Sequence, residues 1–247
     1  MTSTIPAKRK QVKTTLFCAD TAVTNDAFRF GNVNTVALVV GANKTIFHVH
    51  EDTLCTASPV FKAAFESKFK EGTDRTMEMP DEDLDLVEMF VSWLYRNTQH
   101  DNLFELSGPD PEQRMMETAR LFVFADKYDL EALRLGICEK IFDLAANKEN
   151  KVPSFAVLEY VYSNTQRKAI IRQIIADWFA WTDIRRWHLS GDESEAYSTS
   201  WLYNIPEFGV DLALALYNPS CDTTAPTPFD GSKSEYIQKF QKKKTSS

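Results

Sequence analysis

Two short β-prone runs near residue 40 set the strongest limit on the fold of this chain. They are TVALVV at 35–40 and TIFHV at 45–49, and the residues GANK lie between them. Two such runs about a Gly/Asn turn predict a β-hairpin. A third β-prone piece, TMEM at 76–79, is stopped by Pro80, because proline cannot donate to a sheet ladder. The strand signals therefore predict a hairpin and a third short β-prone piece, and the rest of the folded part is predicted to be helical.

The helical part begins at Ser58 and Pro59. Serine is a good N-cap, and proline is tolerated at the first helical position because its missing N–H would have no partner there. Behind them Phe61, Phe65 and Phe69 recur every four residues and are predicted to share one helix face. The PDED sequence at 80–83 is predicted to open a further helix. Apolar spacings predict helices carrying Leu84, Val87, Val91 and Leu94, then Leu121, Phe122, Ala125 and Tyr128, then Leu130, Leu133, Ile137, Ile141 and Leu144.

Polar and proline-rich breaks divide the chain into four parts. Residues 1–30 lack sustained periodicity and are predicted to be a flexible arm, and residues 31–146 are predicted to form the first folded domain. Residues 150–218 carry helical patterns again, including IIRQIIADW from Ile170, and are predicted to form a helical extension. The Thr/Pro/Ser/Lys-rich residues 219–247 are predicted to be a disordered tail.

Charge and cysteine placement exclude several classes of protein. The 247-residue chain has a net charge of −7, so nucleic acid is not expected as its main partner. The basic runs at 7–13 and 242–244 are interpreted as solvated tails, with a nuclear-import signal as the alternative. The apolar runs are too short to cross a membrane, and no secretory signal is recognised. A protein of the cytoplasm or nucleus is expected, with four free thiols at Cys18, Cys55, Cys138 and Cys221.

The stretch HVHEDTLC at 48–55 holds the residue types of a metal site or a thiol catalyst. His48 and His50 would share one strand face, and Cys55 with His50 could form a nucleophile and base. A structural zinc site needs four ligands, usually from two clusters, and the other histidines, His100 and His188, are isolated. No metal, cofactor or catalytic residue is therefore expected. An enzyme built on His48, His50 and Cys55 is kept as a remote alternative.

The order of these elements resembles a BTB/POZ domain, and is most similar to the short BTB proteins of fungi. The similarity covers residues 33 to 145. It implies an α/β (α+β) fold with a small three-stranded sheet and a helical cluster, here followed by an all-helical C-terminal extension. The residues that carry it are the hairpin, His50 with Leu54, Ser58-Pro59-Val60-Phe61, the Phe-rich helix, Trp93-Leu94-Tyr95, and Ala125-Asp126-Lys127-Tyr128 with Leu130 and Leu133.

The resemblance implies a protein–protein interaction module and no enzyme. Family members commonly self-associate, and many bind a cullin scaffold to recruit substrates for ubiquitin ligation. The cullin-binding members carry a hydrophobic-x-Glu motif after the Phe-rich helix, where this chain has Phe69-Lys70-Glu71. The expected role is therefore a substrate adaptor, with Phe65, Phe69 and Glu71 at the partner surface and Tyr128 supporting them.

The alternative is a scaffold or regulator that associates with itself or with other BTB proteins, without ubiquitin transfer. A homodimer is possible, although Asn34-Thr35 stands where dimeric relatives usually carry an aspartate. No familiar substrate-binding domain follows the BTB-like region. An adaptor would therefore have to recognise its substrate through residues 150–218.

Overall fold

Three strands form a mixed sheet in the order β2-β1-β3. Strand β1 (Thr35–Val40) pairs antiparallel with β2 (Thr45–His50), placing Val36 opposite Val49. It pairs parallel with β3 (Thr76–Met79). Val36, Leu38 and Val40 alternate into the core, as the two-residue period of a strand requires. The hairpin, the third strand and its end before Pro80 confirm the prediction.

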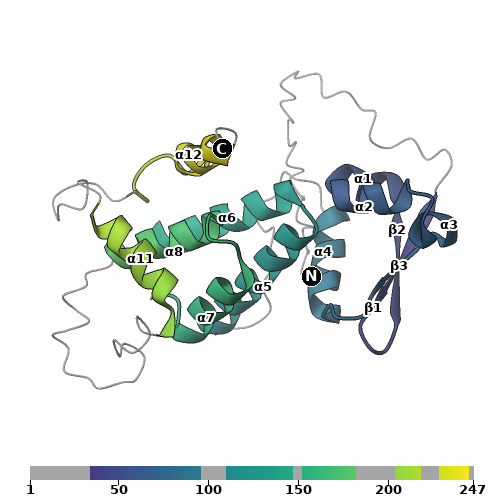
Figure 1. Ribbon diagram of the computed structural model, residues 1–247, viewed down its shortest axis with the longest axis horizontal. Coiled ribbons are helices and arrows are strands. Elements are labelled where there is room, and N and C mark those ends of the chain that lie inside the picture. The colour runs from purple at the N-terminus through teal and green to yellow at the C-terminus, as the bar shows by residue number, and fades with distance from the viewer. Residues whose placement is uncertain (1–33, 96–109, 147–151, 182–203, 218–227, 245–247) are drawn as a thin grey trace, which may run out of the picture. The chain divides into compact units, whose positions relative to one another are not determined.

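The computed structural model describes residues 34–95, 110–146, 152–181, 204–217 and 228–244, and side chains as far as Gln238 (Figure 1). All of these residues belong to one compact unit that begins at Asn34. Several predictions fall outside them: the flexible arm at 1–30, the basic run at 7–13, and the positions of Cys18, His100, His188 and Cys221.

Ten helices are described around and beyond the sheet. Ser58 caps α2, since its Oγ accepts hydrogen bonds from the amides of Val60 and Phe61, both at 3.1 Å. The helices predicted from apolar spacing and from the Ser-Pro signal are confirmed. Their bounds are α1 (Glu51–Ala57), α2 (Pro59–Phe65), α3 (Lys70–Asp74), α4 (Leu84–Tyr95), α5 (Pro111–Lys127), α6 (Glu131–Ala146), α7 (Phe155–Asn164), α8 (Ile170–Trp181), α11 (Pro206–Leu216) and α12 (Lys233–Lys244).

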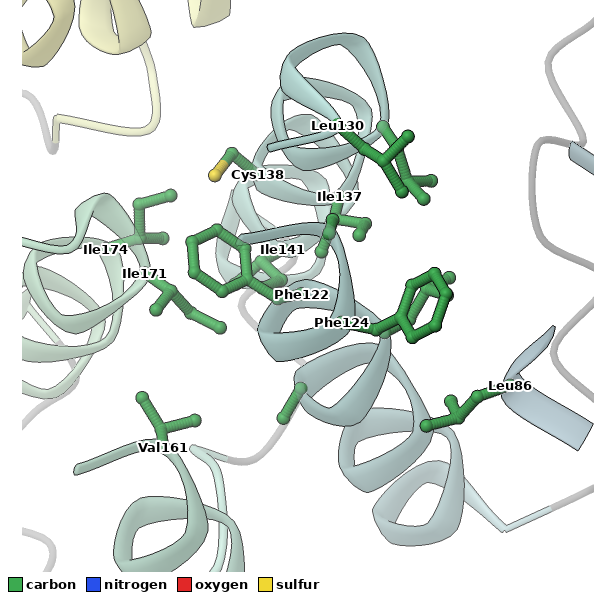
Figure 2. Close-up of a cluster of buried hydrophobic side chains, with 14 of the residues drawn as sticks. Leu86, Phe122, Phe124, Leu130, Ile137, Cys138, Ile141, Val161, Ile171 and Ile174 are labelled. Atoms are coloured by element: carbon green, nitrogen blue, oxygen red, sulfur yellow. The ribbon is translucent and has the colours of Figure 1, made fainter. Parts of the chain in front are cut away.

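Helix α5 lies at the centre of the core. On one side Phe124 packs against Phe90 of α4 and against Tyr128, with ring centroids 5.3 and 4.7 Å away. Phe122 lies on the side of α5 that faces Ile171 and Ile174 of α8 (Figure 2). The buried side chains of the sheet region and of helices α7 and α8 belong to one continuous cluster.

The predicted phenylalanine stripe is wrong at Phe69. Helix α2 ends at Phe65, and Phe61 and Phe65 are buried whereas Phe69 is exposed. The Ser67 hydroxyl donates to the carbonyl of Ala64 at 2.7 Å and accepts from the amide of Phe69 at 3.2 Å. A serine that bonds to nearby backbone offers the chain an alternative to helix, so the four-residue period is broken there.

Two further predictions need correction. The stripe predicted for α4 included Leu84, but this first residue of the helix is exposed, and Leu86, Val87 and Phe90 form the buried face. The tail predicted to be disordered at 219–247 contains helix α12. Phe229, Tyr236 and Ile237 are buried there. Three buried apolar side chains hold this segment in place. The prediction of disorder rested on the overall polar composition of the tail, which does not reveal the positions of single apolar residues.

Candidate protein-binding surface

The backbone of Phe69 is held firmly although its side chain is 77% exposed. Its amide donates to the Ser67 hydroxyl, and its carbonyl accepts from both the amide and the hydroxyl of Thr73, at 3.1 Å each. Three hydrogen bonds therefore fix the point from which the ring projects. A large aromatic side chain presented on a fixed backbone loses little conformational entropy when it binds a partner.

Helix α3, which follows Phe69, is anchored to the sheet at its C-terminal end. Arg75 adopts a left-handed conformation with φ of 53°, and its carbonyl accepts from the amide of Ala37 in β1 at 2.9 Å. Its guanidinium pairs with the carboxylate of Glu51 in α1. The connection from α3 to β3 is thus held to both β1 and α1 through Arg75.

Gly72 is required by a close approach inside this segment. A Cβ atom at Gly72 would lie 2.0 Å from the backbone oxygen of Ser67 and 3.0 Å from that of Phe65. Only glycine allows the first turn of α3 to fold back on the end of α2 in this way. The local shape that presents Phe69 therefore depends on the sequence Phe69-Lys70-Glu71-Gly72.

Acidic side chains gather beside this segment. Glu71 is half-buried and lines a shallow cleft together with Lys70, Asp74, Thr76 and Glu78. The ammonium of Lys70 lies 3.4 Å from the carboxylate of Glu78, and both side chains are exposed. Since three carboxylates face one ammonium, the cleft favours a basic rim on a partner. We call Phe69 together with this cleft the Phe69 surface.

Phe65 and Tyr128 are core residues rather than surface contacts. Phe65 is 3% exposed, so the prediction that it meets a partner directly needs correction: helix α2 turns it inward beside Phe61. The ring of Tyr128 stacks on Phe61 with centroids 5.1 Å apart, and its hydroxyl donates to Glu82 at 3.0 Å. Burial, followed by the charge of Glu82, raises the pKa of Tyr128. Its contacts are with Phe61, Phe124 and Glu82 rather than with the residues of the Phe69 surface.

The surroundings of His48, His50 and Cys55 do not resemble a metal site or a thiol catalyst. The hydroxyl of Tyr95 lies 2.8 Å from both the backbone nitrogen and the Nδ1 of His50, while His48 points to solvent. Burial, then the charge of Glu51, raises the pKa of the Cys55 thiol, whereas a thiol nucleophile needs a lowered pKa. Within the described residues, no three His, Cys, Asp or Glu side chains come together to hold a metal ion.

Helix α11 carries a second apolar surface that the sequence interpretation missed. Val210, Leu214 and Tyr217 are exposed, Tyr217 by 88%, and their spacing of four and three residues places them on one side of the helix. Phe208, Leu212 and Ala215 are buried on the other side. The signal was present in LALALY, which is apolar on both sides of a helix, whereas a helix on a protein surface normally has one polar side.

No helix in the part of the chain that the structure describes has the length and apolarity needed to span a bilayer. Among known families, the BTB/POZ domain matches residues 24–142. A BTB/POZ domain-containing protein of Arabidopsis thaliana is 25% identical over 146 residues, which are 59% of this chain and 55% of that protein. This chain therefore spans about half the length of that protein.

Proposed function

Because residues 24–142 of this chain form a BTB/POZ domain, which is a protein–protein interaction module, we propose that the chain is a substrate adaptor for a cullin-based ubiquitin ligase. In this proposal the chain performs no chemistry itself. The Phe69 surface binds the scaffold, and the helices after the domain bind the substrate. The adaptor acts in the cytoplasm or the nucleus, where such ligases operate.

The observation that carries the proposal is the exposure of Phe69. A phenylalanine that is 77% exposed leaves a large apolar area in water, and burial in a partner groove would remove it. Aromatic anchors of this kind commonly dominate the energy of an interface. The ring also projects from a backbone that three hydrogen bonds fix, so little order has to be created on binding.

Glu71 supports the same role through charge. It lies two residues after Phe69, in a cleft that also contains Asp74 and Glu78. Opposite charges around an apolar anchor increase the rate of association and fix its register. The proposed scaffold face therefore has an apolar pocket for the ring and basic side chains around it.

Substrate recognition is assigned to the helical extension. Helices α7 and α8 share the domain core, so a ligand bound on them would be held rigidly relative to the Phe69 surface. On α11, Val210, Leu214 and Tyr217 provide an apolar surface. An adaptor needs two separate binding surfaces, and these helices supply the second.

The proposal is tested by measuring the binding of the purified chain to a purified cullin N-terminal domain by biolayer interferometry. Phe69→Ala should weaken binding by at least about tenfold, as loss of a central aromatic anchor does. Glu71→Gln should weaken it less and should reduce its dependence on salt.

Ile46→Ala is the matched control, because Ile46 is also a large exposed side chain of the same domain, at 55% exposure. Its binding should equal that of the wild type. Absence of binding by the wild-type chain to a panel of cullins would remove the adaptor role. Equal losses in Phe69→Ala and Ile46→Ala would remove the assignment of Phe69 as the anchor.

The second candidate function is self-association or association with another BTB protein, without ubiquitin transfer. Strand β2 favours it, since it lies at an edge of the described sheet and carries the exposed Ile46. An edge strand can pair with a strand of another chain. Sedimentation at micromolar concentration separates the candidates: a stable oligomer that Ile46→Lys dissociates, and that binds no cullin, favours the scaffold.

A further inference from the structure

The C-terminal segment 228–238 packs on helices α6 and α8 through a few defined contacts. The rings of Phe229 and Tyr236 form one cluster with Phe142 of α6: their centroids lie 5.2 and 5.3 Å from that of Phe142 and 5.9 Å from each other. Ile237, next along α12, is also buried. Two aromatic residues seven positions apart, with one aliphatic neighbour, supply the apolar part of this contact.

Polar contacts fix the same segment at two more points. The hydroxyl of Tyr236 donates to the carboxylate of Asp177 in α8 at 2.5 Å. The ammonium of Lys233 donates to the carboxylate of Asp143 in α6 at 2.7 Å. We call the receiving surface, with Phe142, Asp143 and Asp177, the α6–α8 face. It presents one ring and two acceptors, which match a segment carrying aromatic rings, a hydroxyl and a cation.

The segment depends on this face more than the face depends on the segment. The sequence of α12, KSEYIQKFQKKK, is strongly charged, and an isolated helix of this length is marginal in water. Helix α6 also packs on α5, and α8 packs on α7 and α11. The receiving helices therefore keep most of their contacts when α12 leaves, which is the condition for a local opening that does not unfold the domain.

We propose that the α6–α8 face is a binding site for segments in which an aromatic residue precedes a short amphipathic helix, and that the chain's own segment 228–238 covers it reversibly. The occupant in this structure is that segment. A ligand able to displace it has the same chemistry: two aromatic residues about seven apart, a tyrosine hydroxyl for Asp177, and a cation for Asp143. The site contains no residue of the Phe69 surface and does not depend on the proposed adaptor function.

The test uses the full chain and a fluorescein-labelled peptide of residues 226–244. In the variant Phe229→Ala/Tyr236→Ala/Ile237→Ala the tethered segment should no longer cover the face, so the labelled peptide should bind saturably in a fluorescence anisotropy titration. With a tethered concentration on the order of 1 mM, a segment that binds with a Kd of about 0.1 mM would weaken peptide binding to the wild type about tenfold. The expected result is therefore binding to the variant and at least about tenfold weaker binding to the wild type.

Two controls make the result specific. A peptide carrying the Phe229→Ala and Tyr236→Ala changes should not bind the variant chain. The full-chain variant Leu84→Ala loses an exposed apolar side chain elsewhere and should behave as the wild type. Equal peptide affinity for wild type and triple variant overturns the proposal. Absence of binding to a triple variant with native circular dichroism overturns it as well.

If the triple variant does not fold, hydrogen exchange of the wild type tests whether segment 228–238 opens reversibly. A reversible cover predicts that the amides of residues 233–238 exchange much faster than those of α5, because they open without global unfolding. An excess of the unlabelled peptide should leave α6 and α8 protected. Exchange of residues 233–238 as slow as that of α5 would overturn the proposal.

Discussion

The Ser58 hydroxyl donates a 2.6 Å hydrogen bond to the backbone carbonyl of Tyr128, across 70 residues of sequence. The same oxygen accepts from the amides of Val60 and Phe61, and Ser58 is fully buried. One small side chain therefore caps α2 and holds the connection between α5 and α6. The ring of Tyr128 lies on Phe61, so the polar contact and the aromatic contact join the same two segments.

Ser58→Ala should lower the free energy of unfolding by about 2–4 kcal/mol, as the sum of a lost N-cap and an unpaired buried carbonyl. Urea denaturation followed by circular dichroism measures it. Thr56→Ala removes only an exposed hydroxyl that bonds to its own helix and should change stability by less than about 0.5 kcal/mol. Equal effects of the two substitutions would contradict the assigned role of Ser58.

Arg172→Met should lower the free energy of unfolding by about 3 kcal/mol or more, because buried carbonyls lose their donor. The Arg172 side chain is buried, donates to Thr165 Oγ1 at 2.9 Å and to the carbonyl of Tyr162 at 2.8 Å, and pairs with Glu207 of α11. It thereby connects α7, α8 and α11. Lys70→Met, which breaks an exposed pair with Glu78, should cost less than about 1 kcal/mol.

Gly72→Ala should destabilise the chain by roughly 1–3 kcal/mol, because its Cβ would overlap the backbone oxygen of Ser67. It should also weaken partner binding through Phe69, which the same backbone holds. Gly136→Ala is the opposite control, since outside its own helix backbone a Cβ there meets no described atom within 4 Å. This substitution in α6 should stabilise the chain by about 0.5–1 kcal/mol. Thermal unfolding of the two variants would show shifts of opposite sign.

Asp177→Asn should stabilise the docked C-terminal segment at neutral pH and have no such effect in acid. Burial raises the pKa of Asp177, although hydrogen bonds from Tyr236 and Gln173 lower it in part. Below the ordinary carboxyl pKa of about 4, docked and undocked forms are both protonated, and the burial cost is absent. As the pH rises above that value, the undocked form ionises first, so docking of the wild type weakens until the pH reaches the raised pKa.

The asparagine variant has no charge to bury, so its advantage should appear from about pH 4 upward and reach a plateau once the pH has passed the raised pKa of Asp177. Hydrogen exchange of residues 233–238 across this range measures it. An advantage that is constant with pH would show that burial of the Asp177 charge does not oppose docking.

The elements of the fold could be predicted because their signals are local. The hairpin followed from two β-prone runs about Gly41, whose φ of +66° suits glycine. Helices α5 to α8 could be predicted from the helical spacing of apolar residues, most of which are buried in the core. Phe69 could be named from its sequence position, but its exposure could not, because Ser67 ends the helix through side-chain hydrogen bonds that hydrophobic periodicity does not include.

Other features depend on distant contacts and could not be predicted. Phe229 and Tyr236 are buried in a cluster with Phe142, and that ring comes from a helix about ninety residues earlier in the chain. The double apolar character of α11 was visible in the sequence. Which side packs inward was decided by Phe208, whose ring lies 5.0 Å from that of Phe179 in α8.

The two sides of α5 have a consequence for how this chain can be divided. Phe124 packs toward α4, and Phe122 faces α8 (Figure 2), so α5 packs against neighbouring helices on both of its sides. A fragment that stops after α6 would expose Phe122 and the isoleucines of α6 to water. The fragment that ends at α6 is therefore not expected to fold as an independent domain. Gene fusions and deletions that cut between α6 and α7 should yield insoluble protein, whereas cuts placed after α11 should leave both sides of α5 buried.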